Sequence, residues 1–107
     1  MAKIVYFYLE QCPHCKNADR MFAELIEKKP EYAQVEIAKV EEKQNALYAT
    51  KYDYFYVPAF YVNERKIHEG VPTMEIVENA LKTALAEDWF LQNFGQIKAD
   101  KTKLSTF

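Results

Sequence analysis

Residues 3–15 read Lys-Ile-Val-Tyr-Phe-Tyr-Leu-Glu-Gln-Cys-Pro-His-Cys, an apolar run that leads into two cysteines three positions apart. The run from Lys3 to Leu9 is β-branched and aromatic without polar alternation, which predicts a strand buried on both faces. Apolar residues then recur at helical spacing from Ala18 to Ile26, and Pro13 suits the first turn of that helix. The stretch therefore places both cysteines where a strand gives way to a helix.

The rest of the chain continues the alternation of strands and helices. Pro30 should end the first helix. We then expect a strand at about 34–40, a helix at about 42–52, a strand at 59–62, a turn at 63–65, an edge strand at 66–69, and a last helix from the N-cap Thr73 to Phe94, with Gly95 as its C′ residue. This order predicts an α/β fold of the form β-α-β-α-β-β-α, with a four-stranded mixed sheet flanked by helices. We expect one domain over 1–95 and a polar C-terminal tail over 96–107.

Composition excludes several classes of function. The 107 residues include 14 basic and 16 acidic side chains, well mixed and with a net charge of −2, so no nucleic-acid surface is expected. Only two glycines are present, too few for a phosphate-binding loop, and Ser105 is the only serine, which argues against a serine nucleophile. No apolar stretch is long enough to span a membrane. No secretory signal is recognised, and a cytoplasmic location is expected.

Cys12 and Cys15 are the candidate reactive groups. The unpaired N–H groups and positive dipole end of a helix N-terminus would stabilise a thiolate at Cys12, and His14 adds a donor or a positive charge beside it. Cys15, one turn on, would lie deeper and could attack a mixed disulfide formed by Cys12. Two alternatives are an inert structural pair and a copper or zinc site. A closed zinc site needs about four ligands, and only His14 and His68 could join the two cysteines, so no metal ligand is assigned.

Val57-Pro58 directly before a strand adds to the cysteine motif, because proline is not accommodated inside a central strand and must open one. With these residues the chain resembles the thioredoxin superfamily over about residues 2–87. The resemblance implies a cis-proline at Pro58 packed against the cysteines. It further implies a dithiol oxidoreductase in which Cys12 is the nucleophile and Cys15 the resolving thiol, with Pro13 and His14 completing the catalytic motif. Substrate would contact Val57, Pro58 and Tyr56.

The residues resemble more than one branch of the superfamily. Cys-Pro-x-Cys is similar to glutaredoxins, and Tyr6 stands where thioredoxins have a buried aspartate. Tyr56 and the residues after Gly70 depart from the glutathione signature of glutaredoxins, and Cys-Pro-His-Cys also resembles periplasmic disulfide-forming oxidases. The resemblance implies no bound cofactor, glutathione or a thioredoxin-reductase-type protein as electron source, and a disulfide-containing protein or small thiol as substrate. We expect a monomer, with a weak homodimer as the alternative; the rival function is a non-catalytic thioredoxin-like binding module.

Overall fold

The computed structural model describes the backbone of residues 2–104 and the side chains of residues 2–93. Its elements in chain order are β1 (Lys3–Tyr8), α1 (Pro13–Lys28), the 3-10 helix η1 (Pro30–Gln34), β2 (Glu36–Glu41), α2 (Ala46–Ala49), β3 (Ala59–Val62), β4 (Arg65–Glu69) and α3 (Met74–Leu104). This succession confirms the predicted order of strands and helices and adds η1 after Pro30. None of the described helices is long and apolar enough to cross a membrane.

The four strands form one mixed sheet in the order β2-β1-β3-β4, which confirms the predicted α/β architecture. Strand β1 runs parallel to β2 and antiparallel to β3, and β3 pairs antiparallel with β4. Because β1 is central and both of its faces are covered, it needs no polar alternation. Tyr6 belongs to the apolar cluster on one face and Phe7 to the cluster on the other.

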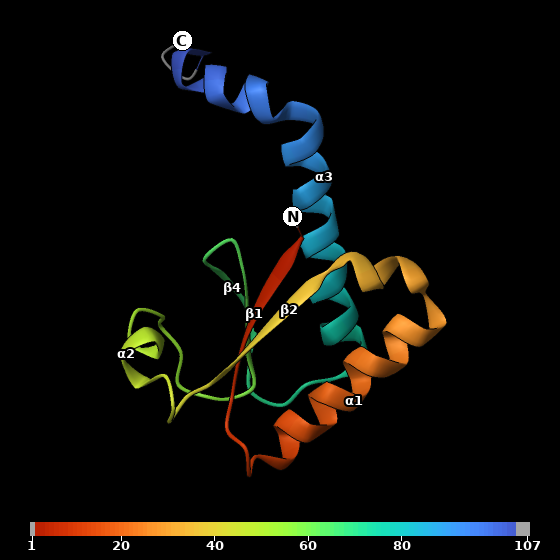
Figure 1. The fold of residues 1–107 in the computed structure, drawn as a ribbon, viewed down its shortest axis with the longest axis vertical. Coiled ribbons are helices and arrows are strands. Elements are labelled where there is room, and N and C mark those ends of the chain that lie inside the picture. Colours follow the sequence, from red (N-terminus) through yellow and green to blue (C-terminus); the bar gives the residue numbers. More distant parts are fainter. Residues whose placement is uncertain (1, 105–107) are drawn as a thin grey trace.

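Helices α1 and α3 cover one face of the sheet, and α2 lies on the opposite side (Figure 1). The first face, called here the helical face, buries Tyr6, Phe22, Phe60 and Leu81 in one cluster. The second, called here the tyrosine face, buries Phe7 and Tyr61 against the loop that follows α2. The far half of α3 continues beyond the sheet (Figure 1).

Helix α2 (Ala46–Ala49) is shorter than the predicted 42–52, and its late start is explained by Glu41 at the end of β2. Its carboxylate accepts hydrogen bonds from the backbone N–H groups of Lys43 (2.6 Å) and Gln44 (3.0 Å). Its carbonyl oxygen accepts from the side-chain amide of Asn45 at 3.0 Å. These bonds hold residues 43–45 in a turn, so the helix begins only at Ala46.

The last helix corrects the prediction that Gly95 ends it. Thr73 caps the helix as expected, since its hydroxyl accepts from the Ile76 N–H at 3.1 Å, but α3 continues through Gly95 to Leu104. A glycine inside a helix costs only about 1 kcal/mol relative to alanine, and the residues that follow it are mostly good helix formers. Residues 105–107 of the predicted tail lie outside the described residues. A domain boundary at 95 stays a prediction.

Candidate active site

The two cysteines lie at the start of α1, at the lower end of the molecule in Figure 1. Cys12 is the N-cap of the helix and half-buried, whereas the side chain of Cys15 is buried with 2% exposed. The Cys15 N–H donates to Cys12 Sγ at 3.2 Å. A sulfur at the N-cap position thus accepts one of the N–H groups that a helix start leaves unpaired, as a thiolate there requires.

Pro13 and His14 lie between the cysteines and are both exposed. Pro13 occupies the first turn of α1, where its missing N–H leaves no bond unmade. The His14 side chain makes no hydrogen bond within the described part of the chain, and the Cys12 sulfur instead contacts the Cys15 N–H and the Val57 carbonyl, so the expected donation from His14 to Cys12 is not part of this structure. His14 is therefore close to Cys12 in the sequence but is not hydrogen-bonded to it.

Cys15 lies in apolar surroundings that keep its thiol protonated. Burial raises the pKa of the Cys15 thiol to about 12, and its hydrogen bond with Cys12 acts in the same direction. Tyr6, on the strand beneath, donates its hydroxyl to the Cys15 carbonyl oxygen at 2.7 Å. Burial, and then the nearby carboxylate of Asp19, raises the pKa of Tyr6 above its ordinary range. Tyr6 therefore supports Cys15 as a neutral donor to its backbone.

The loop before β3 brings the second part of the predicted site to Cys12. The peptide bond between Val57 and Pro58 is cis. The Val57 carbonyl oxygen lies 3.9 Å from Cys12 Sγ, and Pro58 is buried behind it. Tyr56 is exposed, with 68% of its surface accessible. Cys12, Val57 and Pro58 thus meet although 45 positions separate Cys12 from Val57 in the chain.

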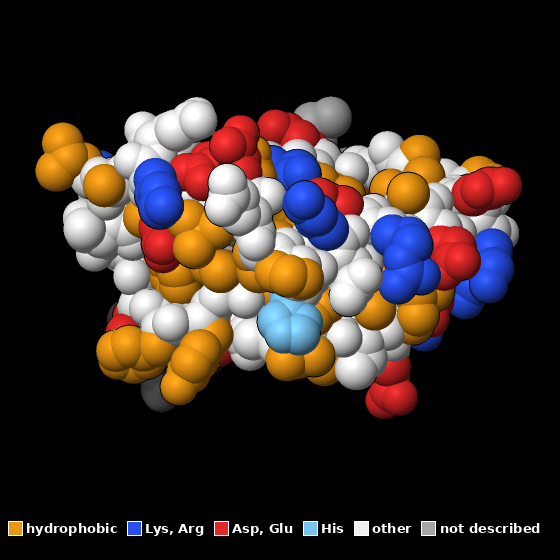
Figure 2. All heavy atoms as spheres, turned by 90° about the horizontal axis from the view of Figure 1, so that it is seen from below, with side chains coloured by type: hydrophobic (Ala, Val, Ile, Leu, Met, Phe, Trp, Pro, Cys, Tyr) orange, Lys and Arg blue, Asp and Glu red, His pale blue; other side chains and the backbone are white. Residues whose placement is uncertain are grey.

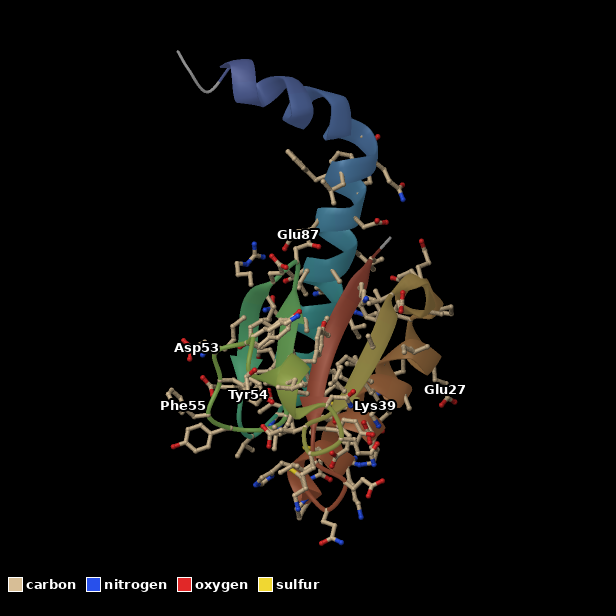
Figure 3. All side chains as sticks on the ribbon, turned by 60° about the vertical axis from the view of Figure 1, so that its left-hand side comes forward. Glu27, Lys39, Asp53, Tyr54, Phe55 and Glu87 are labelled. Atoms are coloured by element: carbon tan, nitrogen blue, oxygen red, sulfur yellow. The ribbon has the colours of Figure 1, made fainter. Side chains whose placement is uncertain are left out.

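Two residues at this site were missed by the sequence analysis. Glu69, the last residue of β4, accepts from the backbone N–H groups of Phe55 at 2.7 Å and Tyr56 at 3.0 Å. Phe55 lies on the loop before β3 at the edge of the molecule and points away from the sheet (Figure 3). No signal in the sequence indicated Glu69, because a regular hairpin turning at residues 63–64 would place residue 68 opposite Ala59, and only the register shift between Phe60 and Tyr61 places Glu69 there.

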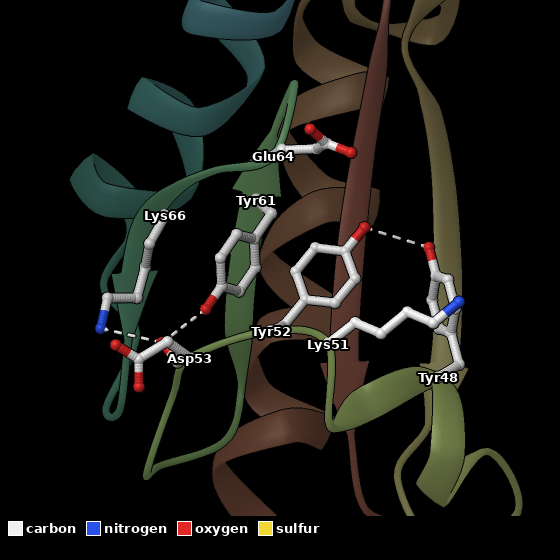
Figure 4. Close-up of a pocket in the computed structure, with 7 residues that line it drawn as sticks. All are labelled: Tyr48, Lys51, Tyr52, Asp53, Tyr61, Glu64 and Lys66. Carbon is white, nitrogen blue, oxygen red and sulfur yellow. Dashed lines mark hydrogen bonds between the residues drawn. The ribbon is translucent and has the colours of Figure 1, made fainter.

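Two cavities differ in their relation to the thiols. One of about 250 Å³ lies against Cys12 and is lined also by Leu9, Glu10, Gln11 and Lys43. A larger one of about 640 Å³ opens on the tyrosine face and contains no cysteine (Figure 4). Among residues 2–93, no three His, Cys, Asp or Glu side chains are grouped so that they could hold a metal ion.

Comparisons with known proteins agree with this geometry. Residues 1–88 match the family model described as thioredoxin. A thioredoxin of Methanocaldococcus jannaschii is 34% identical over 83 residues, which cover 78% of this chain and 95% of that protein. Among solved structures, the thioredoxin of Fasciola hepatica superposes with a TM-score of 0.55 at 26% identity, over 75% of this chain and 78% of the other. The oxidised thioredoxin of Plasmodium falciparum gives a TM-score of 0.57 at 19% identity, over 76% and 78% of the two chains.

Proposed function

The chain belongs to the thioredoxin family, and from that premise we propose that it is a thiol–disulfide oxidoreductase that uses both cysteines. The observation that carries the proposal is the asymmetry of the pair. Cys12 Sγ is partly accessible and accepts the Cys15 N–H at 3.2 Å, whereas Cys15 is buried and held protonated. Cys12 is thus the sulfur that can attack a substrate disulfide, and Cys15 stays protonated until the second step.

In the first step the Cys12 thiolate attacks one sulfur of a substrate disulfide. A bond forms between Cys12 and that sulfur, the substrate disulfide breaks, and the other substrate sulfur leaves as a thiolate. The helix start stabilises the attacking thiolate through the Cys15 N–H. The Val57 carbonyl, 3.9 Å from Cys12 Sγ, lies where the backbone of an extended substrate could pair with it.

In the second step Cys15 attacks Cys12 within the mixed disulfide. The proton of Cys15 passes to the thiolate released in the first step, a disulfide forms between Cys12 and Cys15, and the second substrate sulfur leaves as a thiolate. Two electrons have then moved from the protein to the substrate. The hydrogen bond with Cys12 and its charge help to raise the pKa of Cys15, and the mixed disulfide removes that charge. Burial still raises the pKa of Cys15 in the mixed disulfide, but the part of the shift that comes from Cys12 is lost, which makes Cys15 easier to deprotonate at this step.

We further propose the substrates of the protein, its electron source and its cellular compartment. Substrates are disulfide-containing proteins or small disulfides, and the protein acts as a monomer without a bound cofactor, nucleic acid or membrane. The family match favours a thioredoxin-reductase-type electron source. Glutathione is the second candidate, favoured by the glutaredoxin-like Cys-Pro-x-Cys form of residues 12–15. A cytoplasmic location fits either source, because that compartment keeps thiols reduced.

The test is a trapping experiment with single-cysteine variants. Cys15→Ser should accumulate a stable mixed disulfide with a disulfide-bridged peptide, whereas Cys12→Ser should form none and should lose turnover of a chromogenic aryl disulfide. Mass measurement of the wild type should show a loss of two hydrogens on oxidation. Parallel assays with glutathione and with a thioredoxin reductase identify the electron source. The proposal is wrong if Cys12→Ser retains turnover, or if Cys15 is alkylated before Cys12 in the reduced wild type.

A further inference from the structure

The cavity of about 250 Å³ against the proposed nucleophile is formed by two loops. The segment that joins β1 to α1 contributes Leu9, Glu10, Gln11 and Cys12, and the turn after β2 contributes Lys43. The loop that carries the cis-proline does not line it. Figure 2 views the molecule from the end that carries the start of α1 and shows side chains of both charges next to each other among hydrophobic ones. The surroundings of Cys12 therefore include a hollow with charged walls.

The walls of this cavity carry one positive and one negative side chain. Lys43 and Glu10 are both exposed. Within the part of the chain whose side chains are described, neither the Lys43 ammonium group nor the Glu10 carboxylate forms a hydrogen bond or an ion pair. Both groups are therefore available to a ligand that carries the opposite charges.

A buried carboxylate fixes the two walls relative to each other. Glu41, the last residue of β2, is 6% exposed. Its Oε2 accepts from the Glu10 N–H at 3.2 Å, and its Oε1 accepts from the Lys43 N–H at 2.6 Å. Burial acts to raise the pKa of Glu41, but the N–H donors of Gln44, Glu10 and Lys43 hold it below its ordinary range, so the carboxylate stays charged at neutral pH. The backbones of Glu10 and Lys43 are thus joined through one side chain beside Cys12.

The size and the charges of the cavity indicate a class of ligand. Pockets for drug-sized ligands enclose roughly 300–1,000 Å³, and this cavity is smaller, so it fits a compact group. A free amino acid carries an ammonium group and a carboxylate, which are complementary to Glu10 and Lys43. In a half-cystine both groups are attached to the carbon next to the one that bears the sulfur. A half-cystine bonded to Cys12 must therefore place its charges in the immediate surroundings of that sulfur.

We propose that the cavity is a subsite for small disulfides of the cystine type, in which Lys43 pairs with the carboxylate and Glu10 with the ammonium group of the half-cystine bonded to Cys12. The inference rests on the proposed function, because it names a substrate of the same reaction. Cys12 attacks one sulfur of cystine, and the other half leaves as a thiolate that takes the proton of Cys15. Cys15 then attacks Cys12, and the second half leaves as a thiolate. Each turnover thus reduces cystine to free cysteine and leaves a disulfide between Cys12 and Cys15.

Analogues of cystine that lack one kind of charge test the pairing. Cystamine lacks the carboxylates, dithiodipropionate lacks the ammonium groups, and hydroxyethyl disulfide lacks both. The second-order rate constant at which each disulfide oxidises the reduced protein is divided by that for the same disulfide with dithiothreitol, which removes differences in intrinsic reactivity. Because exposed ion pairs are weak, cystine should exceed cystamine and dithiodipropionate by about two- to fivefold each. Both preferences should decrease at high salt, which screens exposed charges.

Charge-removing variants assign each preference to one side chain. Lys43→Gln should abolish the preference for cystine over cystamine and leave that over dithiodipropionate unchanged. Glu10→Gln should do the reverse. Lys16→Gln and Glu24→Gln, which are exposed on α1 but outside the cavity, are the matched controls and should leave both preferences unchanged. Circular dichroism should show all four variants folded, because each replaces an exposed side chain.

The outcomes separate this inference from the proposed function. If the wild type reduces neither these small disulfides nor a disulfide-bridged peptide, the proposed function fails. If it reduces them without a preference for cystine, or if Lys43→Gln keeps the preference over cystamine, the inference alone is overturned. An equal loss of that preference in Lys16→Gln would also overturn it, because the cause would then be the charge of the whole surface around Cys12.

Discussion

The two faces of the sheet are built on different principles. The helical face is filled by apolar side chains such as Phe22, Phe60 and Leu81, which are almost fully buried. The tyrosine face packs aromatic rings whose hydroxyls stay at the rim and form hydrogen bonds. Tyr61 donates to the Asp53 carbonyl at 2.7 Å, and Tyr48 and Tyr52 share a bond of 3.1 Å beside the open cavity (Figure 4). Apolar burial thus dominates one face, and polar contacts at the edge of an aromatic layer dominate the other.

This difference divides the site into two halves. Cys15 comes from α1, whose buried side, with Ala18 and Phe22, packs into the helical face. The loop with Phe55 and Val57 lies on the tyrosine face. Val57 packs against the apolar cluster of that face, and Glu69 accepts a hydrogen bond from the Phe55 N–H. Packing therefore fixes the thiols, while hydrogen bonds fix much of the surface that would meet substrate. The catalytic half should be the more resistant to solvent conditions.

The largest effect is expected at alkaline pH, where tyrosines on both faces matter. The pKa values of Tyr32 and Tyr52 are raised to about 12, for Tyr32 chiefly by burial and for Tyr52 chiefly by the hydrogen bond with Tyr48. Burial also raises the pKa of Tyr6 and Tyr61. A tyrosine in the unfolded chain ionises near pH 10, so above that pH the unfolded state loses protons first and stability falls. Each such tyrosine should contribute about 1.4 kcal/mol per pH unit.

The measurement is the urea midpoint as a function of pH, with tyrosinate absorbance recorded on the same samples. Stability should begin to fall near about pH 8.5, where Cys15 ionises in the unfolded chain but not in the folded one, and should fall more steeply above about pH 10, where the tyrosines do the same. Tyr61→Phe removes one of the shifted groups and should make the fall shallower. A midpoint that stays level through pH 11 would show that these tyrosines ionise without unfolding the protein, and the assigned role of the tyrosine face would be wrong.

A smaller effect is expected when a leucine is shortened inside the helical face and, for comparison, on the exposed side of α2. Leu81→Ala, in the centre of the helical face, should lower the free energy of unfolding by about 2–5 kcal/mol, because it removes a fully buried side chain and leaves a cavity. Leu47→Ala on α2, where 86% of the leucine is exposed, should change it by no more than about 0.5 kcal/mol. Both values follow from urea unfolding monitored by circular dichroism. Equal losses for the two variants would show that burial of Leu81 does not stabilise the helical face as assigned.

Much of the fold could be predicted because local patterns and long-range packing agree. The unalternating run of β1 predicted a strand covered on both faces, and the prolines at 13, 30 and 58 marked real boundaries. Predicted helix bounds were wrong where a single polar side chain or a weak stop signal decided where the helix begins or ends. Glu41 shortened α2 through bonds to residues 43–45, which no periodicity reveals. Gly95 was interpreted as a stop, although nothing in the helix before it requires one.

The site could be predicted as a set of residues but not as a geometry. Spacing in the sequence indicated that Cys12 and Cys15 share one side of a helix start, and the proline motif indicated the loop that approaches them. The support from Glu69 could not be seen, because it depends on the hairpin register and on the rotamer of one carboxylate. Likewise, the exposed position of His14 follows from how α1 begins on the sheet, which the motif alone does not determine.

The smallest expected effect compares one hydroxyl on each face. Tyr6→Phe removes a buried hydrogen bond of 2.7 Å to the Cys15 carbonyl and should lower the free energy of unfolding by about 0.5–1.5 kcal/mol. Tyr54→Phe removes a bond of 2.7 Å to Glu42 Oε1 at a partly exposed site, where water can replace the donor, and should cost less, about 0.5 kcal/mol. Only Tyr6→Phe should also change the rate at which Cys15 is alkylated in urea-free buffer, because only that hydroxyl contacts the cysteine. If Tyr54→Phe proves the more costly change, or if it alters Cys15 alkylation as strongly, then the tyrosine face contributes directly to the thiol pair and the two halves of the site are not separate.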